Sequence, residues 1–225
     1  MIELLAVGKV YGAGPGRTVA LEGVTVRIEE GQFVAVAGPS GSGKTTLLNL
    51  IGAIDDPTSG AVRIDGRLLR DLSETERADL RLHRIGFIFQ HFNLVPVLTA
   101  AENVEFPLLF HRGLAPRERR RRVKEALERV DLGSRAHRRP SEMSGGELQR
   151  VAVARTLAAS PAIVLADEPT ASLDHVTGAA VIGLMRSLNQ ERKTTFLYAT
   201  HDTELLGLAD RVVRLRDGRL VEDAG

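Results

Sequence analysis

The stretch Gly38-Pro39-Ser40-Gly41-Ser42-Gly43-Lys44-Thr45 decides how the rest of this sequence is interpreted. It follows the apolar run Phe33 to Ala37 and leads into a stretch with helical character. Glycines allow consecutive backbone N–H groups to curl around an anion, and the amino terminus of the following helix carries partial positive charge. We therefore expect a phosphate-binding loop between a buried strand and a helix, with Lys44 reaching the β and γ phosphates of ATP.

Two threonines at the end of this loop extend the expected site. Thr45 offers a hydroxyl to Mg²⁺, which prefers oxygen ligands and retains part of its water shell. Thr46 comes next in the chain and is expected to contact the same nucleotide. The alternative, a glycine-rich turn that binds nothing, leaves the lysine and the flanking apolar run without an explanation.

A pair of carboxylates follows another apolar run far along the chain. Asp167 and Glu168 come directly after Ile163 to Ala166, so a buried strand would deliver both acids to the carboxyl edge of a sheet. We expect Asp167 to hold the Mg²⁺ shell and Glu168 to take a proton from an attacking water. Such a pair can also begin a solvated loop, but the phosphate-binding loop favours the functional interpretation.

Hydrophobic periodicity predicts an α/β fold. Buried-strand runs recur at Ile85 to Phe89 and at Thr195 to Ala199, separated by helical patterns, which indicates a parallel core. Alternation over Val24 to Ile28 predicts an edge or antiparallel strand, and Asp65-Gly66 and Asp217-Gly218 predict hairpin turns. We expect one domain, with residues 1–89 and 143–225 forming the core and residues 90–142 an inserted helical lobe.

Three helix starts have the serine or threonine, then glutamate, spacing of a capping box. They are Ser73 with Glu76, Thr99 with Glu102, and Ser144 with Glu147.

Composition bounds the remaining possibilities. The 30 basic and 29 acidic residues nearly cancel, so the whole molecule lacks the positive field of a dedicated nucleic-acid binder. The absence of cysteine excludes disulfides, thiolate metal sites and cysteine nucleophiles. Neither a secretory signal nor an apolar segment of about 20 residues is evident, so we expect a soluble, cytoplasmic chain.

The segment Ser144-Gly145-Gly146-Glu147-Leu148-Gln149-Arg150, placed before the carboxylate pair, resembles the signature of the ATP-binding-cassette family. In physical terms it is a capped helix that begins with two glycines, which makes a second anion site. The resemblance implies a P-loop NTPase core with an antiparallel β subdomain and an inserted α-helical subdomain. It also implies a homodimer in which Ser144, Gly145, Gly146 and Glu147 act on ATP held by the other copy.

Further roles are implied by the same resemblance, which covers essentially the whole chain. Gln90 looks like the glutamine that senses the metal and the attacking water, and His201 like the histidine that contacts the γ phosphate. Asp174, in Ser172-Leu173-Asp174, looks like part of the loop that joins the two sites, and Tyr11 stands where the family stacks an aromatic ring on adenine. Met143 and Leu148 depart from the usual signature but spare its serine and glycines.

Residues 90–99 and 102–104 look like the lipoprotein-releasing and macrolide-exporter group, which also includes cell-division ATPases. The group implies an integral membrane permease as partner, no nucleic acid, and a peripheral position on the cytoplasmic face of the inner (plasma) membrane. A cassette ATPase acting on nucleic acid or the ribosome is the main alternative, although no long heptad region interrupts the cassette. A small kinase would leave the signature segment unused.

Two segments keep open interpretations. Arg117 to Lys124 contains six basic residues and one acid, which fits a solvated helix or a contact with anionic lipid headgroups. Phe92 to Leu98 is an apolar stretch broken by Pro96, so it is expected to be a loop. Its apolar side chains, Leu94 and Leu98 among them, either pack in the core or form a docking surface for the membrane partner.

Overall fold

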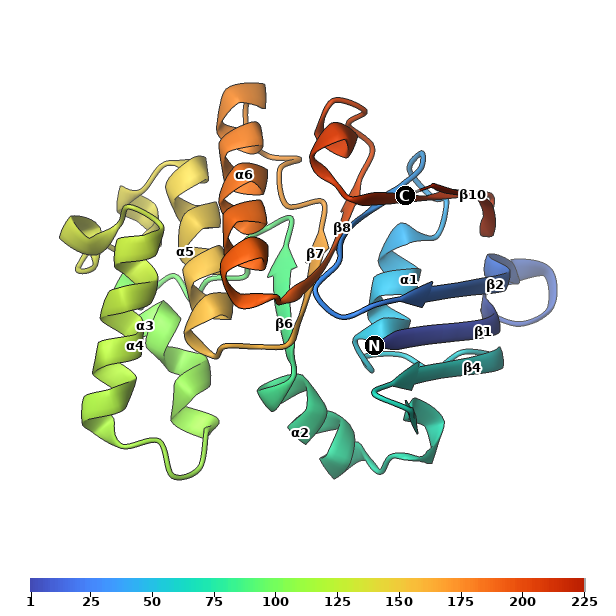
Figure 1. Ribbon diagram of the computed structural model, residues 1–225, viewed down its shortest axis with the longest axis horizontal. Coiled ribbons are helices and arrows are strands. Elements are labelled where there is room, and N and C mark those ends of the chain that lie inside the picture. The colour runs from blue at the N-terminus through green and yellow to red at the C-terminus, as the bar shows by residue number, and fades with distance from the viewer. Residues whose placement is uncertain (225) are drawn as a thin grey trace.

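The computed structural model describes residues 1–224 and contains a six-stranded sheet, a four-stranded sheet and a group of helices (Figure 1). In spatial order, the larger sheet consists of β10 (Arg219–Ala224), β9 (Arg211–Arg216), β3 (Phe33–Ala37), β8 (Thr195–Thr200), β7 (Ile163–Asp167) and β6 (Ile85–Phe89). Its strands pair in parallel from β9 to β6, and β10 joins β9 antiparallel. The predicted parallel core is therefore confirmed.

The smaller sheet is entirely antiparallel and comprises β2 (Thr18–Ile28), β1 (Ile2–Tyr11), β4 (Ser59–Ile64) and β5 (Arg67–Leu68). Strand β2 is at its edge and buries Val24, Val26 and Ile28 on one face, as the alternation predicts. Both hairpin turns are also confirmed, because Asp65 and Gly66, and likewise Asp217 and Gly218, have the positive φ angles that such turns require.

The helices fall into two groups. Those that carry or flank the core are α1 (Lys44–Ile51), α2 (Glu74–His83), α5 (Gly145–Ala158) and α6 (His175–Arg192). The lobe contains α3 (Ala100–Glu105), the 3-10 helix η3 (Phe106–Phe110) and α4 (Pro116–Arg129), followed by η4 (Gly133–Arg135) and η5 (Pro140–Glu142). Short 3-10 helices also occur at η1 (Gly14–Gly16), η2 (Leu69–Asp71) and η6 (Leu205–Leu208). Capping boxes are present at all three predicted helix starts.

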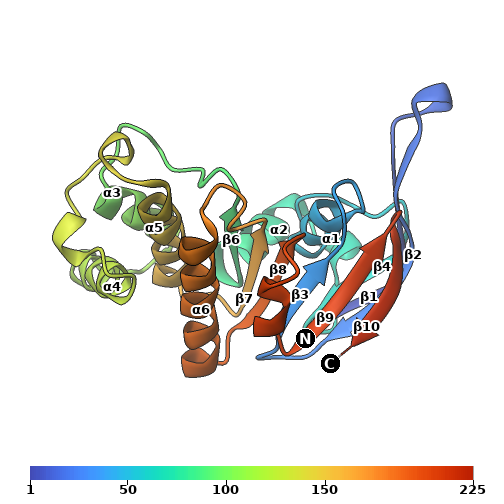
Figure 2. The same ribbon diagram turned by 90° about the horizontal axis from the view of Figure 1, so that it is seen from above.

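The lobe lies at the end of the molecule opposite the antiparallel sheet, beyond α5 and α6 (Figure 2). Helix α4 presents Val123, Ala126 and Leu127, at helical spacing, to the interior. These residues belong to the same hydrophobic cluster as buried residues of α5 and α6. The expected division into a core and a lobe stays a prediction, because no separate hydrophobic cluster marks the lobe among the described residues.

Alternation along the central strands produces two hydrophobic clusters, one on each face of the larger sheet. Phe33, Ala35 and Ala37 contribute to the cluster that contains the lobe, α5 and α6. Val34 and Val36 contribute to the other cluster, which contains α1 and the antiparallel sheet. Burial on both faces explains why these strands are apolar throughout. Within residues 1–224, no helix is both long and apolar enough to cross a bilayer.

Candidate functional site

The phosphate loop, residues 38–45, connects β3 to α1 as predicted. Two of its three glycines are required by close packing: a Cβ atom at Gly38 would lie 2.3 Å from the carbonyl oxygen of Leu215, and one at Gly43 would lie 2.5 Å from that of Ala20. Helix α1 begins at Gly43 without a side-chain cap, and the Ser42 hydroxyl is buried without a hydrogen-bond partner among the described residues. The loop therefore leaves donor groups uncommitted, as an anion site must.

Lys44, Glu168 and His201 form a chain of polar contacts over this loop. The buried Lys44 Nζ donates to the carbonyl oxygens of Gly38 and Pro39, at 2.8 and 3.1 Å, and lies 3.3 Å from Glu168 Oε1. The other carboxylate oxygen of Glu168 is 2.8 Å from His201 Nδ1. The three side chains come from α1 and from the ends of β7 and β8, so the structure brings together residues far apart in sequence.

Glu168 has an unusual backbone conformation, with φ at 47°. Residues other than glycine rarely adopt this left-handed region, and such strain is concentrated at functional sites. Glu168 comes directly after β7, which ends at Asp167. Its conformation places the carboxylate between the ammonium of Lys44 and the imidazole of His201.

Thr45 and Asp167 meet at the carboxyl edge of the sheet, where the threonine hydroxyl donates to Asp167 Oδ1 at 3.1 Å. Burial raises the pKa of Asp167, and the nearby Glu168 carboxylate raises it further, while Thr45 and Lys44 act in the opposite direction. This acid is thus a partly buried anion with few compensating charges. A hydroxyl and a buried carboxylate are oxygen ligands of the class Mg²⁺ prefers, so the residues present fit that ion.

Gln90 follows the last residue of β6, and Phe89 pairs in register with Asp167 on β7. The parallel register therefore places Gln90 at the same sheet edge as the two acids. Ser172 of the loop after β7 lies next to it, with its hydroxyl 3.5 Å from the Gln90 carbonyl oxygen.

Tyr11 lies at the end of β1 and is 40% exposed. Its hydroxyl donates to Asp55 Oδ2 at 2.8 Å, and Lys9 Nζ lies 4.9 Å from the ring centroid. Burial and the Asp55 carboxylate raise the pKa of this phenol, whereas a hydrogen bond with Thr46 lowers it. The ring is thus beside the first turn of α1, and its stacking on adenine stays a prediction.

The second predicted anion site is the start of α5. Ser144 Oγ accepts from Glu147 N, and the Glu147 carboxylate accepts from Ser144 N and pairs with Arg135. A Cβ atom at Gly146 would lie 2.5 Å from Cγ2 of Thr177, so the glycine is also needed for packing against α6. Helices α1 and α5 lie on opposite faces of the sheet, since their buried residues belong to different clusters (Figures 1 and 2).

Asp174 is the N-cap of α6. Its carboxylate accepts from Thr177 N at 3.0 Å and from Thr177 Oγ1 at 2.6 Å. The role expected for it across a dimer stays a prediction, and within one chain its carboxylate serves as a helix cap.

Sequence reasoning missed two residues that fix the loop after Gln90. The buried Asn103 accepts from Val95 N and donates to the carbonyl oxygens of Val95, Leu98 and Thr99, at 2.7 to 3.2 Å. Arg155 donates to the carbonyl oxygens of Phe92 and Asn93. Both resemble ordinary polar helix residues in the sequence. A signal was available for Asn103, because an asparagine inside an apolar helix face requires partners.

Some side chains of residues 92–98 are half-buried and others are exposed, so core packing and docking to a partner apply to different residues of this loop. Leu94 is half-buried and packs against the cluster around α5, which favours the core interpretation for this side chain. Leu98 is likewise half-buried. Val97 is 73% exposed and Val95 is 36% exposed, so these two apolar side chains of the loop are available for a partner, Val97 more fully.

Comparisons with known proteins agree with this geometry. The sequence pattern of the ABC transporter family matches residues 21–171. The chain is 48% identical over 216 residues to the lipoprotein-releasing system ATP-binding protein LolD of Pseudomonas syringae pv. tomato, covering 96% of this chain and 95% of LolD. It is 45% identical to the macrolide export ATP-binding/permease protein MacB of Rhodopirellula baltica, of which it spans 33%, with 99% of this chain covered.

A solved structure of the ATP-binding cassette MJ0796, described as a dimeric, post-hydrolysis state bound to ADP and Pi, superimposes with a TM-score of 0.91. The two chains share 45% sequence identity, and the match covers 99% of this chain and 97% of the other.

Proposed function

This chain belongs to the ABC transporter family, and we propose that two copies of it enclose two ATP molecules and use their hydrolysis to move an integral membrane partner. The partner would be a permease of the lipoprotein-releasing or macrolide-exporting kind. The chain would sit on the cytoplasmic face of the membrane through that permease. No nucleic acid is required in this scheme.

The observation that carries this proposal is the placement of two anion-directed helix starts on opposite faces of one sheet. Only the start of α1 carries a lysine and an uncapped loop. The start of α5, with Ser144 and two glycines, has no lysine and packs in the other hydrophobic cluster. Each is half of a nucleotide site, and two copies facing each other would make two complete sites.

The contacts around Lys44 suggest how binding prepares hydrolysis. In this structure the ammonium of Lys44 lies beside Glu168 Oε1. Phosphate oxygens of bound ATP would replace Glu168 as the partner of Lys44, because they carry more negative charge. Glu168 would then be free to accept the proton of the attacking water, while His201, already 2.8 Å from the same carboxylate, would turn its imidazole toward the γ phosphate.

Thr45 and Asp167, with Gln90 at the adjoining strand end, would hold Mg²⁺. That ion would neutralise part of the charge on the phosphates. The raised pKa of Asp167 supports this assignment, because a cation would offset the cost of burying its charge.

Coupling to the membrane partner would use the loop of residues 92–98. Asn103 and Arg155 hold its backbone, so its position is tied to Gln90 at the sheet edge. Val97 is the most exposed apolar side chain of this loop. We expect Val97→Ser to reduce co-purification with the permease and to leave the ATPase activity of the isolated chain unchanged. A loss of that ATPase activity would contradict the docking role.

The decisive experiment uses Glu168→Gln, which preserves size but removes the base. Hydrolysis should fall by about 10²–10⁴-fold, because that is the usual contribution of a placed proton acceptor. With ATP and Mg²⁺ the variant should elute as a dimer in gel filtration, since bound ATP is not consumed. The control is Glu168→Gln combined with Lys44→Ala, which should stay monomeric. A monomer in both cases, with ATP bound to the first variant, would refute the paired arrangement.

A further inference from the structure

A pocket that the nucleotide site does not use lies between α4 and the ends of α5 and α6. We call it the arginine pocket, and it is a cavity of about 220 Å³. It is lined by Arg121, Arg122, Glu125, Ala126 and Arg129 of α4, Leu157, Ala158 and Ser160 at the end of α5, and Arg192 at the end of α6. Four guanidinium groups and one carboxylate therefore surround it.

Ion pairs position most of these guanidinium groups without using all of their donors. Arg122 engages Glu118 through Nε, and Arg129 engages Glu191 through Nη1. Because a guanidinium has five N–H donors in a rigid fork, both retain unused donors. Arg121 has fewer unused donors, since Nε and both Nη atoms each donate one hydrogen bond to Glu118 or Glu125.

Arg192 is the least compensated member of the pocket. Within residues 1–224 its hydrogen-bond partner is the Ser160 hydroxyl, at 3.1 Å, and it forms no ion pair with a carboxylate there. Burial lowers the pKa of Arg192, and the neighbouring positive charges of Arg129 and Arg122 lower it further, while the carboxylates of Glu191 and Glu125 act in the opposite direction. The lining residues show that guanidinium groups from two helices converge on the same space.

A second cavity continues from this pocket. It has a volume of about 320 Å³ and shares Ser160 and Arg192 with the arginine pocket. Its remaining lining includes Arg84, Lys193 and His83 together with a single acid, Glu30. A ligand longer than one phosphate group therefore has space to extend past Ser160 under positive charge.

We propose that the arginine pocket binds a phosphate-bearing anion. One phosphate group lies among Arg122, Arg129 and Arg192, accepts from the Ser160 hydroxyl, and the rest of the ligand extends into the adjoining cavity. Planar guanidinium forks suit phosphate oxygens, and several of them converge here with free donors. The ligand would connect α4 of the lobe to the end of α6.

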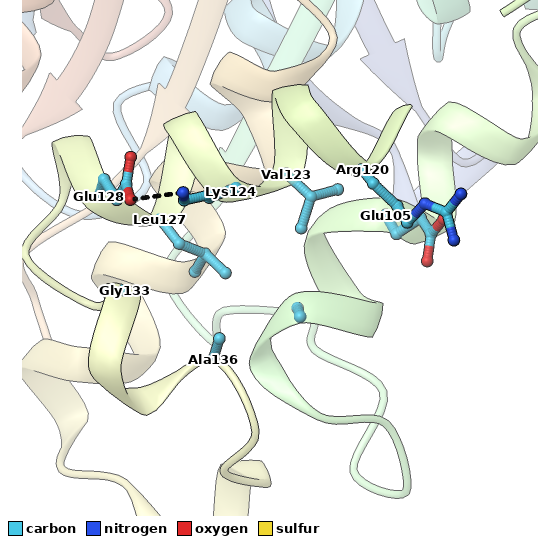
Figure 3. Close-up of a pocket in the computed structure, with 9 residues that line it drawn as sticks. Glu105, Arg120, Val123, Lys124, Leu127, Glu128, Gly133 and Ala136 are labelled. Carbon is cyan, nitrogen blue, oxygen red and sulfur yellow. Dashed lines mark ion pairs between the residues drawn. The ribbon is translucent and has the colours of Figure 1, made fainter. Parts of the chain in front are cut away.

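The opposite side of the same helix provides a matched control. A cavity of about 320 Å³ lies there, with Val123, Leu127 and Ala136 as its apolar floor (Figure 3). Its rim balances Arg120 and Lys124 against Glu105 and Glu128, so it offers an anion no comparable excess of positive charge. Arg120→Gln removes one positive charge from α4, as Arg129→Gln does, but on the face opposite the arginine pocket.

The test is a calorimetric titration of inorganic pyrophosphate into the full chain saturated with ADP, which keeps the phosphate loop filled. We expect one pyrophosphate to bind per chain. Arg192→Gln and Arg129→Gln should each weaken binding about tenfold or more, the usual loss for a charge-assisted hydrogen bond, and Arg120→Gln should leave it unchanged. Arg192 is exposed, so its substitution should not affect folding, and an unchanged thermal unfolding midpoint would check this.

A parallel measurement identifies the source of the phosphate. Vesicles of phosphatidylcholine with phosphatidic acid should sediment the chain in an Arg192-dependent manner if the ligand is a lipid headgroup. Pyrophosphate binding without vesicle binding identifies a soluble ligand instead. Binding of neither, or equal weakening by Arg120→Gln, would overturn the proposal. The ATPase activity of Arg192→Gln without pyrophosphate should equal that of the unaltered chain. If pyrophosphate does not bind the arginine pocket, the proposed nucleotide function is therefore unaffected.

Discussion

The starts of α1 and α5 are both glycine-containing helix amino termini, but they differ in capping and in the hydrogen-bond partners of their side chains. At α1, no side chain caps the helix, the Ser42 hydroxyl lacks a partner among the described residues, and Lys44 bonds to carbonyl oxygens of its own loop. At α5, Ser144 and Glu147 cap each other and Arg135 balances the glutamate. The first end has no side-chain cap and leaves donors that an anion can satisfy, whereas the second already has a reciprocal capping box.

This difference predicts that the two helix starts contribute differently to nucleotide binding. The start of α1 should supply most of the affinity for nucleotide, since its helix end is uncapped and its Lys44 ammonium can exchange loop carbonyl oxygens for phosphate oxygens. The start of α5 should add a weaker contact that matters once nucleotide is already held. Four experiments test this comparison, from the largest expected effect to the smallest.

Lys44→Ala should have the largest effect. It removes the ammonium that is buried in the loop. Nucleotide affinity should fall by about 10²-fold or more, because two charge-assisted hydrogen bonds that this ammonium would donate to phosphate oxygens are lost. Equilibrium dialysis with labelled ATP measures the loss. Affinity within about threefold of the unaltered chain would show that α1 does not dominate binding.

Ser144→Arg should leave nucleotide binding by the single chain intact but stop turnover, because the large cation blocks contact with nucleotide on a facing copy. Mixing this variant with Lys44→Ala should restore part of the ATPase rate, since one of the two composite sites is then complete. The rate of phosphate release measures it. Confirmed mixed dimers without any recovery would mean that each chain hydrolyses ATP alone.

The pH dependence of stability and of nucleotide binding should come from Asp167, which contacts Thr45 in the first turn of α1. Burial raises the pKa of Asp167, so without nucleotide the free energy of unfolding should decrease as pH rises through this raised pKa, where the buried acid ionises. Binding of nucleotide with Mg²⁺ requires the carboxylate and should weaken as pH falls through the same range. Asp167→Asn should remove both trends in thermal unfolding and in nucleotide titrations. Persistence of either trend would assign it to another group.

The smallest effects should come from two serine substitutions measured without nucleotide. Ser144→Ala removes an N-cap and should lower the free energy of unfolding by about 1 kcal/mol. Ser42→Ala removes a buried hydroxyl that lacks a partner, so stability should stay unchanged or rise slightly. Urea unfolding of both variants measures the difference. Equal destabilisation would show that the two helix ends are completed in the same way.

Local patterns in the sequence were sufficient for much of this fold. The central strands are buried on both faces, so an unbroken apolar run such as Phe33 to Ala37 identifies them. Capping boxes and Asp-Gly turns act within a few residues, so their spacing alone predicts them. The phosphate loop, with its lysine directly at the start of a helix, belongs to the same category.

Contacts between distant residues could not be predicted in this way. The bridge from Lys44 through Glu168 to His201 depends on the order of the strands and on the left-handed backbone of Glu168. The burial of Leu94 and the exposure of Val97 depend on hydrogen bonds from Asn103 and Arg155, which no local pattern shows. The convergence of Arg122 and Arg192 likewise requires two helices to be placed in space.

The position of β3 has a consequence for synthesis of the protein. This strand precedes the phosphate loop and spans residues 33–37, yet both of its neighbours in the sheet, β8 and β9, lie between residues 195 and 216. A chain emerging from the ribosome therefore exposes the nucleotide-binding sequence before the strands that support it are made. Nucleotide binding should begin only after those late strands are released, and until then the apolar β3 is a target for chaperones.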